Sequence, residues 1–336
     1  MRNRIIIAGI ALLLLCSSSK ANDTFATLGA GGLVSQKTTE VVMESEDLQI
    51  SPHQIVVRYV FRNITDKDVE AVVAFPLPDL HGGDVYHEPM SLPDESQLNF
   101  VDFTVASGGK PISASLESRA WLEGRDITPR LEAIHLPVSV LVKPLNQALA
   151  KLSPAEIKRL ETEDLIASEE YADSATGKMK RDWYAAWTMR VKFYWTQRFP
   201  AHQTVELTQT YRPVVGGSYI PANDSGNSSA RRYCGGPEAF REIAEFKQRH
   251  PAKNQDDISL WERTVRYILT TANNWNGPIR KFHVTVLSDA SEDIVLTCLP
   301  GLKRTGDTRY EVSHSDWRPT AEIELMILQA HKPDGR

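Results

Sequence analysis

The fold is decided by the stretch Ile55–Pro78, which reads IVVRYVFRNITDKDVEAVVAFPLP. On both sides of the polar segment NITDKD, apolar side chains recur at every second position, which is the period of a strand with one buried face. We therefore predict an antiparallel β-hairpin here. Pro76 and Pro78 cannot donate hydrogen bonds to a ladder, so the FPLP segment is expected to leave the sheet in an extended conformation.

A second pair of strands is predicted later in the chain. Large apolar residues alternate with polar ones from Trp187 to Trp195, FPAHQ turns the chain, and Thr204–Tyr211 runs back. This pattern predicts another hairpin. Its aromatic stripe resembles a ligand platform, but a period of two in a long strand is more typical of the core face of a sheet.

The remaining patterns predict a mainly β protein built as two antiparallel β-sandwich-like domains. The N-terminal domain is expected at 22–215 and the C-terminal domain at 216–336. The second begins with a linker rich in Gly, Ser and Asn and a short helix, and continues with five short strands.

A helical insert is predicted in the first domain, at about 144–184. Ser153, Pro154 and Glu156 supply the N-cap, the first-turn proline and the capping-box acid of a helix start. The insert is expected to return to the sheet through the polar link DSATGKMKRD.

The first 21 residues have the basic, apolar and small-residue order of a secretory signal peptide. Cleavage is expected after Ala21, which gives a mature chain that starts at Asn22 and is periplasmic or secreted. The alternative is a lipid anchor on Cys16, but the preceding Leu15 is bulky where that processing prefers a small residue. No later segment is long and apolar enough for a membrane helix, so no membrane span is expected in the mature chain.

Charge limits the class of partner. Removal of the signal peptide leaves 35 basic against 43 acidic residues, a net charge of −8. A general polyanion binder needs the opposite balance, so nucleic acid is not an expected partner.

Two cysteines remain after cleavage, Cys234 and Cys298. An even number of cysteines in an exported chain favours a disulfide over two free thiols. Neither belongs to a CxxC pair, which disfavours redox catalysis and zinc binding. We predict that they form a bridge.

The best candidate for a metal site is the loop Asp79–Glu88, DLHGGDVYHE, directly after FPLP. Its candidate ligands are Asp79, His81, Asp84 and His87, with Glu88 beside them. Imidazole and carboxylate groups bind zinc, and a glycine-bent loop can wrap an ion. Polar loops contain such residues by default, however, and no fixed ligand spacing is matched.

The sequence contains no GxSxG, HExxH or P-loop pattern, so no catalytic residues and no cofactor are expected. It favours a binding protein or an envelope structural protein over an enzyme, with an unidentified envelope protein or extracellular ligand as partner. The alternative is a hydrolase, metal-dependent or not, that uses the loop Asp79–Glu88 and requires convergent polar groups in a pocket.

Four phrases carry a resemblance to a known family. They are LGAGGL, FRNITDKDVEAVVAFPLPD, FYWTQRFPAHQTVELTQTYRPVVGGS and LTTANNWNGPI. Together they resemble the bacterial family known as domain of unknown function 4424, over most of the mature chain. The resemblance implies an exported protein without an assigned activity, and it transfers no catalytic residue.

A fainter resemblance is to the VIT domain, a β-sandwich found beside von Willebrand A modules. It rests on the Asn-containing turn, the run from Glu70 to Pro78, the Gly109-Lys110 turn and the late strand pair around Phe199-Pro200. It implies a single N-terminal sandwich interrupted by the insert. The chain lacks the adjoining von Willebrand A module, so metal-dependent adhesion does not follow.

Overall fold

The computed structural model describes residues 24–29, 32–88, 90–92, 99–174, 176–252 and 258–330. The predicted signal peptide and its cleavage site lie outside these ranges. Within them, no helix combines the length and the apolar character needed to cross a membrane.

Sheet A contains the second strand of the opening stretch. From one edge to the other its strands are β10 (Arg125–Asp126), β9 (Ser115–Leu122), β13 (Thr188–Phe199), β5 (Val69–Pro76), β1 (Thr24–Gly29) and β2 (Gly32–Gln36), with β6 (Leu80–His81) also paired to β13. All its pairings are antiparallel.

Sheet B contains the first strand of the opening stretch. Its order is β19 (Lys303–Arg304), β20 (Arg309–Trp317), β17 (Ile279–Leu287), β3 (Val41–Ile50), β4 (Ile55–Asn63), β14 (Thr204–Tyr211), β7 (Thr104–Ser107) and β8 (Lys110–Ile112). The pairing of β17 with β3 is parallel.

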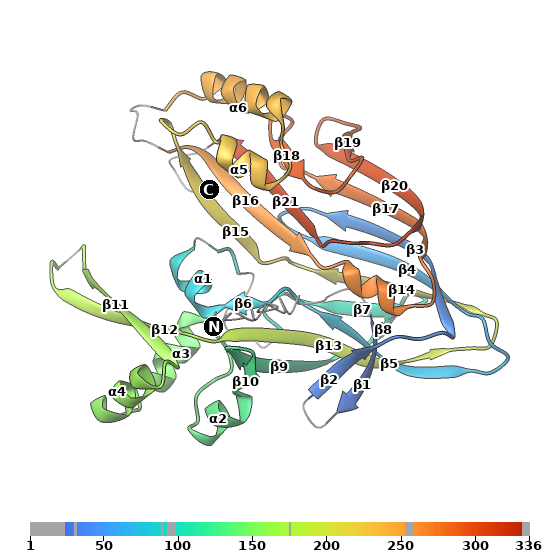
Figure 1. Ribbon diagram of the computed structural model, residues 1–336, viewed down its shortest axis with the longest axis horizontal. Coiled ribbons are helices and arrows are strands. Elements are labelled where there is room, and N and C mark those ends of the chain that lie inside the picture. Colours follow the sequence, from blue (N-terminus) through green and yellow to red (C-terminus); the bar gives the residue numbers. More distant parts are fainter. Residues whose placement is uncertain are drawn as a thin grey trace, which may run out of the picture.

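A third sheet, sheet C, and several helices follow. Sheet C has the order β15 (Val215–Pro221), β16 (Ile258–Tyr267), β21 (Ile323–Ala330) and β18 (Ile294–Thr297). The helices are α1 (Gly82–His87), α2 (Thr128–Ala133), α3 (Val142–Leu149), α4 (Pro154–Thr162), α5 (Asn227–Arg232), α6 (Pro237–Arg249) and the 3₁₀ helix η1 (Thr270–Asn274). In Figure 1, sheet A forms the lower layer, sheets B and C form the upper one, and α5 and α6 lie above sheet C.

Sheets A and B bury their facing sides against each other. Phe75 in sheet A packs 5.5 Å from Tyr211 in sheet B, and Phe199 in sheet A lies 6.0 Å from Phe61 in sheet B, measured between ring centroids. All four rings belong to one buried cluster. Burying an aromatic side chain of this kind contributes about 1.5–3 kcal/mol. The prediction of a mainly β, sandwich-like fold is confirmed, and the aromatic stripe of β13 lies in its core.

The two predicted hairpins are instead arches between the sheets. β4 pairs with β3 and β14 in sheet B, whereas β5 pairs with β1 and β13 in sheet A. β13 and β14 are divided between the sheets in the same way. The hairpin predictions are wrong because alternation shows only that each strand has one buried face, which also holds for strands that face each other across a core.

The turns of the two arches are joined to each other. Asn63 is fully buried, and its side-chain amide donates to the carbonyls of Lys67 at 2.7 Å and Phe199 at 2.8 Å. Asp68 accepts from the backbone N–H of Ala201 at 2.9 Å and from Nε of Arg198 at 2.9 Å. These bonds favour the ionised carboxylate, so the pKa of Asp68 is lowered.

The insert is only partly helical. α4 begins as predicted, since Ser153 Oγ accepts from the N–H of Glu156 at 3.3 Å and the Glu156 carboxylate accepts from the N–H of Ser153 at 2.7 Å. The helical prediction is wrong beyond α4, where β11 (Ile166–Ala172) and β12 (Met179–Ala185) form a hairpin that projects from the body (Figure 1). Polar residues occupy both faces of that hairpin, so its sequence shows no apolar alternation.

The five strands predicted in the C-terminal part are present as β16, β17, β18, β20 and β21. They do not form a separate sandwich: β17 and β20 extend sheet B, whereas the other three belong to sheet C. The reason is that β17 pairs with β3 of sheet B, so it does not form a second sheet that faces sheet C. The division at residue 215 as a boundary between folding units stays a prediction.

The predicted disulfide joins Cys234 to Cys298. Cys234 follows α5, and Cys298 follows β18. Gly235 allows the close approach of the backbone here, because an added Cβ would lie 2.9 Å from the carbonyl oxygen of Ala230. The bridge therefore fastens the α5–α6 turn to the edge of sheet C.

Candidate functional site

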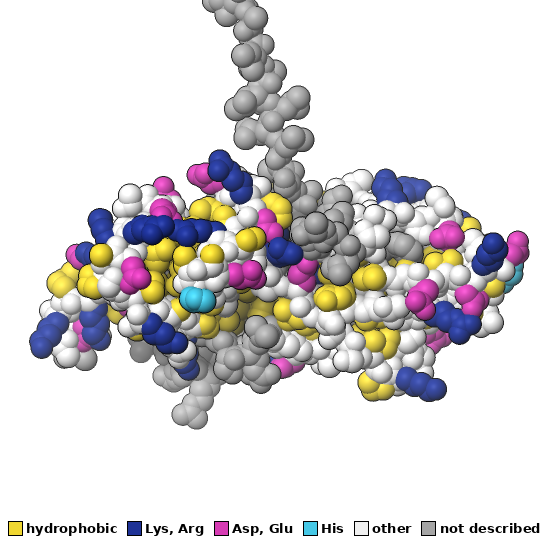
Figure 2. Space-filling model, turned by 90° about the horizontal axis from the view of Figure 1, so that it is seen from below, with side chains coloured by type: hydrophobic (Ala, Val, Ile, Leu, Met, Phe, Trp, Pro, Cys, Tyr) yellow, Lys and Arg dark blue, Asp and Glu magenta, His cyan; other side chains and the backbone are white. Residues whose placement is uncertain are grey.

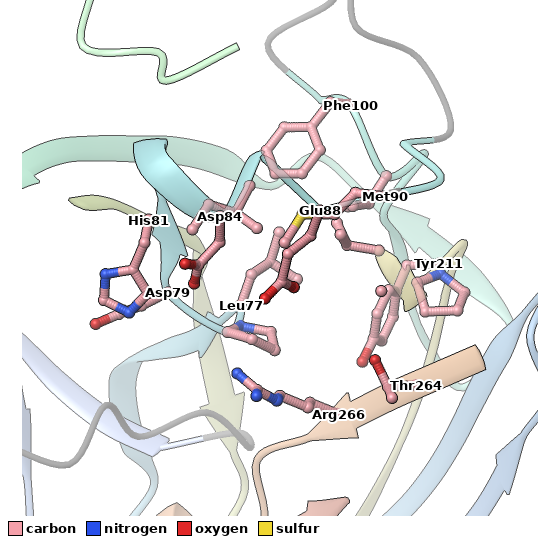
Figure 3. Close-up of a pocket in the computed structure, with 16 residues that line it drawn as sticks. Leu77, Asp79, His81, Asp84, Glu88, Met90, Phe100, Tyr211, Thr264 and Arg266 are labelled. Atoms are coloured by element: carbon pink, nitrogen blue, oxygen red, sulfur yellow. The ribbon is translucent and has the colours of Figure 1, made fainter. Parts of the chain in front are cut away.

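A cavity of about 90 Å³ lies between the segment after β5 and sheet C (Figure 3). Its lining comes from three distant parts of the chain. The residues that line it are Leu77, Pro78, Asp79, Leu80, His81, Asp84, Glu88, Met90, Phe100, Val101, Tyr211, Pro213, Val214, Gly216, Thr264 and Arg266. The loop predicted as a candidate site is thus one wall of a cavity.

The FPLP segment positions that wall. The prediction that this segment leaves the sheet is wrong, because Phe75 and Pro76 still pair with β13 and Leu77 donates its N–H to the carbonyl of Val191 at 2.9 Å. Proline removes one donor, but the neighbouring residues still bond to the strand. Gly82 then donates to the carbonyl of Trp187 at 3.1 Å. A Cβ on Gly82 would lie 2.1 Å from the carbonyl oxygen of Ala185, so only glycine allows α1 to start this close to β12.

The opposite wall comes from β15 and β16. Gly216 pairs with Thr264, and a Cβ on Gly216 would lie 2.5 Å from Oγ1 of that threonine. The glycine therefore leaves the Thr264 hydroxyl uncovered. Arg266 follows two positions later and projects toward the same cavity (Figure 3).

Tyr211 forms a buried part of the lining. Its side chain is 3% exposed, and its hydroxyl makes no hydrogen bond to any residue that the structure describes. Burial raises the pKa of Tyr211 far above its ordinary value, so the phenol stays protonated at physiological pH. The hydroxyl oxygen itself is accessible from the cavity, so an acceptor group of a ligand can take the place of water there.

The charged groups of the cavity stand on two sides. Asp84 and Glu88 lie on α1 or just after it, and neither carboxylate forms an ion pair within the described part of the chain. Arg266 lies across from them (Figure 3), with its Nε 3.7 Å from an oxygen of Glu324. Asp79 is already ion-paired, since it accepts from Nε of Arg190 at 3.0 Å.

The structure separates the predicted metal ligands. Asp79, His81 and Asp84 line the cavity together with Glu88. His87 does not: its Nδ1 lies 3.6 Å from Glu169 of β11, and its ring packs edge-on against Tyr184.

The remaining histidine of the loop is fixed by a neighbouring strand. His81 Nδ1 lies 2.7 Å from the hydroxyl of Thr188. Within the described ranges, no group of three His, Cys, Asp or Glu side chains has the arrangement of a metal site. Metal binding by the loop stays a prediction.

A larger cavity of about 520 Å³ lies between α2 and the α3–α4 pair. Figure 2, which views the molecule from below, shows hydrophobic side chains beside Lys and Arg on the left part of the visible face. Two of its basic groups are already engaged, because Arg130 and Arg159 each donate to Glu163 at 2.7 Å. Both arginines of this cavity are therefore paired within the protein.

Sequence reasoning missed Tyr211, Thr264 and Arg266. The double glycine Gly216-Gly217 inside a strand was the available signal, since glycine within a strand often marks a close approach of backbone or ligand. Nothing in the sequence connects that position with the loop around His81.

The comparisons with known proteins decide the family. The model of the family described as domain of unknown function DUF4424 matches residues 21–326. The chain belongs to this family. The fainter resemblance to the VIT domain stays a prediction.

The other comparisons do not identify a function. No curated protein matches the chain significantly. The solved structures include a Legionella pneumophila protein, provisionally assigned as a nutrient binding protein, with 15% identity and a TM-score of 0.46. That likeness covers 92% of this chain and 70% of the other.

Proposed function

We propose that this DUF4424 protein is an exported binding protein whose cavity beside α1 takes a small organic ligand. The observation that carries the proposal is Tyr211, a side chain only 3% exposed that lines the cavity and whose hydroxyl has no hydrogen-bond partner among the described residues. The walls are apolar at Leu77 and Phe100, and a few polar groups converge on the space between them. This combination is typical of small-molecule sites.

Binding fits this cavity better than catalysis. A metal-dependent hydrolase needs three protein ligands around one ion, but Asp79 is ion-paired with Arg190 and His87 is turned toward Glu169. A nucleophilic mechanism needs a base and a nucleophile that both face the substrate. His81 contacts the hydroxyl of Thr188 at 2.7 Å, but Thr188 does not line the cavity. The hydrolase built on Asp79–Glu88 is the alternative, and this contact is the observation on which it would rest.

Of the two binding roles, the cavity favours a small ligand over an envelope protein partner. A protein partner needs a broad surface of at least about 1,000 Å². The feature observed is a small concave space with the Tyr211 hydroxyl as a donor on its wall, which suits a ligand of few atoms.

Removal of the Tyr211 hydroxyl tests the ligand site. We expect Tyr211→Phe to leave the free protein equally stable or slightly more stable, because the lost hydroxyl had no protein partner. Ligands found by a thermal-shift screen of small polar metabolites should bind about three- to tenfold more weakly to this variant, as measured by calorimetry.

The matched control is Tyr171→Phe, which removes an exposed phenol on the projecting hairpin. It should leave the affinity of those ligands unchanged. A screen without any ligand whose affinity depends on Tyr211 would contradict the proposal.

Export is supported by the disulfide, which persists in oxidising compartments. When the full chain is expressed in a bacterium with a periplasm, we expect the mature protein to start at Asn22 and to fractionate with soluble periplasmic material. Intact mass should show no reactive thiol. An acyl-modified Cys16 at the N-terminus would contradict this expectation and support the lipid anchor.

A further inference from the structure

The cavity beside α1 has a donor side and an acceptor side. Arg266 and Thr264 lie two positions apart on β16, and in Figure 3 the Tyr211 hydroxyl lies beside Thr264, whereas the guanidinium group of Arg266 extends away from these two hydroxyls. Arginine donates only, and the protonated phenol and the threonine hydroxyl are able to donate as well. This side therefore offers a guanidinium group and two hydroxyls as donors.

The acceptor side is formed by α1 and the residue after it. Asp84 and Glu88 are one helical turn apart, and the backbone N–H of Glu88 donates to the carbonyl of Asp84 at 2.8 Å, which fixes the spacing of the two residues. Ionised carboxylates only accept hydrogen bonds. Both side chains line the cavity, and both lack an ion pair in the described part of the protein.

The two sides do not neutralise each other. Within the described ranges, Arg266 forms no ion pair with Asp84 or Glu88, and its contact with Glu324 is long, at 3.7 Å. Arg266 and Glu88 are exposed and hydrated in the free protein, and a ligand that carries both complementary charges can replace that water. Leu77, Phe100 and Met90 supply the apolar surface for the rest of such a ligand.

We propose that the ligand is a small zwitterion with a short apolar body, such as alanine, which matches a cavity of about 90 Å³. Its carboxylate lies against Arg266, Thr264 and Tyr211, and its ammonium group lies against Asp84 and Glu88. This inference rests on the proposed function, and it adds the chemistry and orientation of the ligand. Charge-assisted hydrogen bonds of this kind are the stronger ones, so each end contributes to selection.

Calorimetry on the mature chain with matched compounds tests the inference. The probes are alanine, its decarboxylated amine ethylamine and its deaminated acid propionate, which share one short apolar body. We expect alanine to bind roughly 10- to 100-fold more tightly than the amine or the acid. Equal binding by the amine or by the acid would overturn the zwitterion.

Two variants assign the two ends. Arg266→Gln should weaken the zwitterion at least tenfold and leave the weak binding of the amine unchanged. The double variant Asp84→Asn and Glu88→Gln should weaken the zwitterion similarly and leave the acid unchanged. Loss of binding of all three probes in either variant would contradict the assigned orientation.

The matched controls are Arg241→Gln and Glu245→Gln, which change the same charges on the exposed face of α6. They should leave every affinity unchanged. If the zwitterion fails but a neutral or acidic compound binds in a Tyr211-dependent way, only this inference fails. If no compound binds in that way, the proposed function fails with it.

Discussion

Replacement of both cysteines of the bridge by serine is expected to lower the free energy of unfolding by about 4 kcal/mol. The bridge joins residues 64 positions apart, so its loss releases a long loop in the unfolded chain and raises the entropy of that state. A change of this size is a large share of the stability of a typical domain. Urea unfolding followed by tryptophan fluorescence measures it.

The wild type in reducing buffer is the control for this experiment. It should unfold at the same urea concentration as Cys234→Ser/Cys298→Ser, because both lack the same covalent link. Both cysteines are exposed, so serine there creates no buried cavity. A double variant as stable as the oxidised wild type would show that the α5–α6 turn is held by packing alone.

Substitution of Gly82 by alanine is expected to destabilise the protein by about 1–3 kcal/mol and to abolish binding at the cavity beside α1. The added Cβ would lie 2.1 Å from a backbone oxygen and 2.8 Å from the side chain of Ala185. Backbone atoms cannot rotate away, so α1 must move from β12 and carry Asp84 with it. Thermal unfolding and calorimetry with the best ligand measure the two effects.

The neighbouring Gly83→Ala variant is the matched control. A Cβ at this position meets no atom within 4 Å, and alanine favours a helix over glycine by about 0.5–1 kcal/mol. We therefore expect this variant to be slightly more stable and to keep its ligand affinity. Equal destabilisation by both substitutions would mean that glycine flexibility, rather than the contact with Ala185, is what α1 requires.

The positions of the strands were easier to predict than the strands with which they pair. The alternation in Ile55–Asn63 and Val69–Pro76 located both strands nearly to the residue. Which sheet each joins depends on how the chain crosses at the turn between them, where Asn63 bonds to the carbonyl of Phe199 from a distant strand. A periodicity contains no information about such a contact.

The hairpin β11–β12 was missed for a different reason. Its cross-strand pairs include Glu169 with Asp182 and Tyr171 with Lys180, so neither face is continuously apolar. A projecting ribbon has no buried face along most of its length, and burial is what produces a readable alternation.

One wall of the candidate site was predictable from the sequence, and the opposite wall was not. The loop after FPLP was selected for its polar residues, and it does line a cavity. Arg266 was not predictable as a site residue. It occupies a polar position in the alternating pattern of β16, where an exposed residue is expected. Only the packing of sheet C beside the loop gives that side chain a role.

The parallel pairing of β17 with β3 has a consequence for the order in which the molecule can be assembled. Leu48 and Val284 are direct partners although their positions differ by 236. During synthesis the N-terminal part of the chain is made first, so one edge of the ten-residue strand β3 stays unpaired until β17 follows. Contacts so distant in sequence slow folding, and an open strand edge invites pairing with other molecules. A chain cut short before residue 279 keeps that edge permanently, so we expect such fragments to aggregate rather than to fold as an isolated N-terminal half.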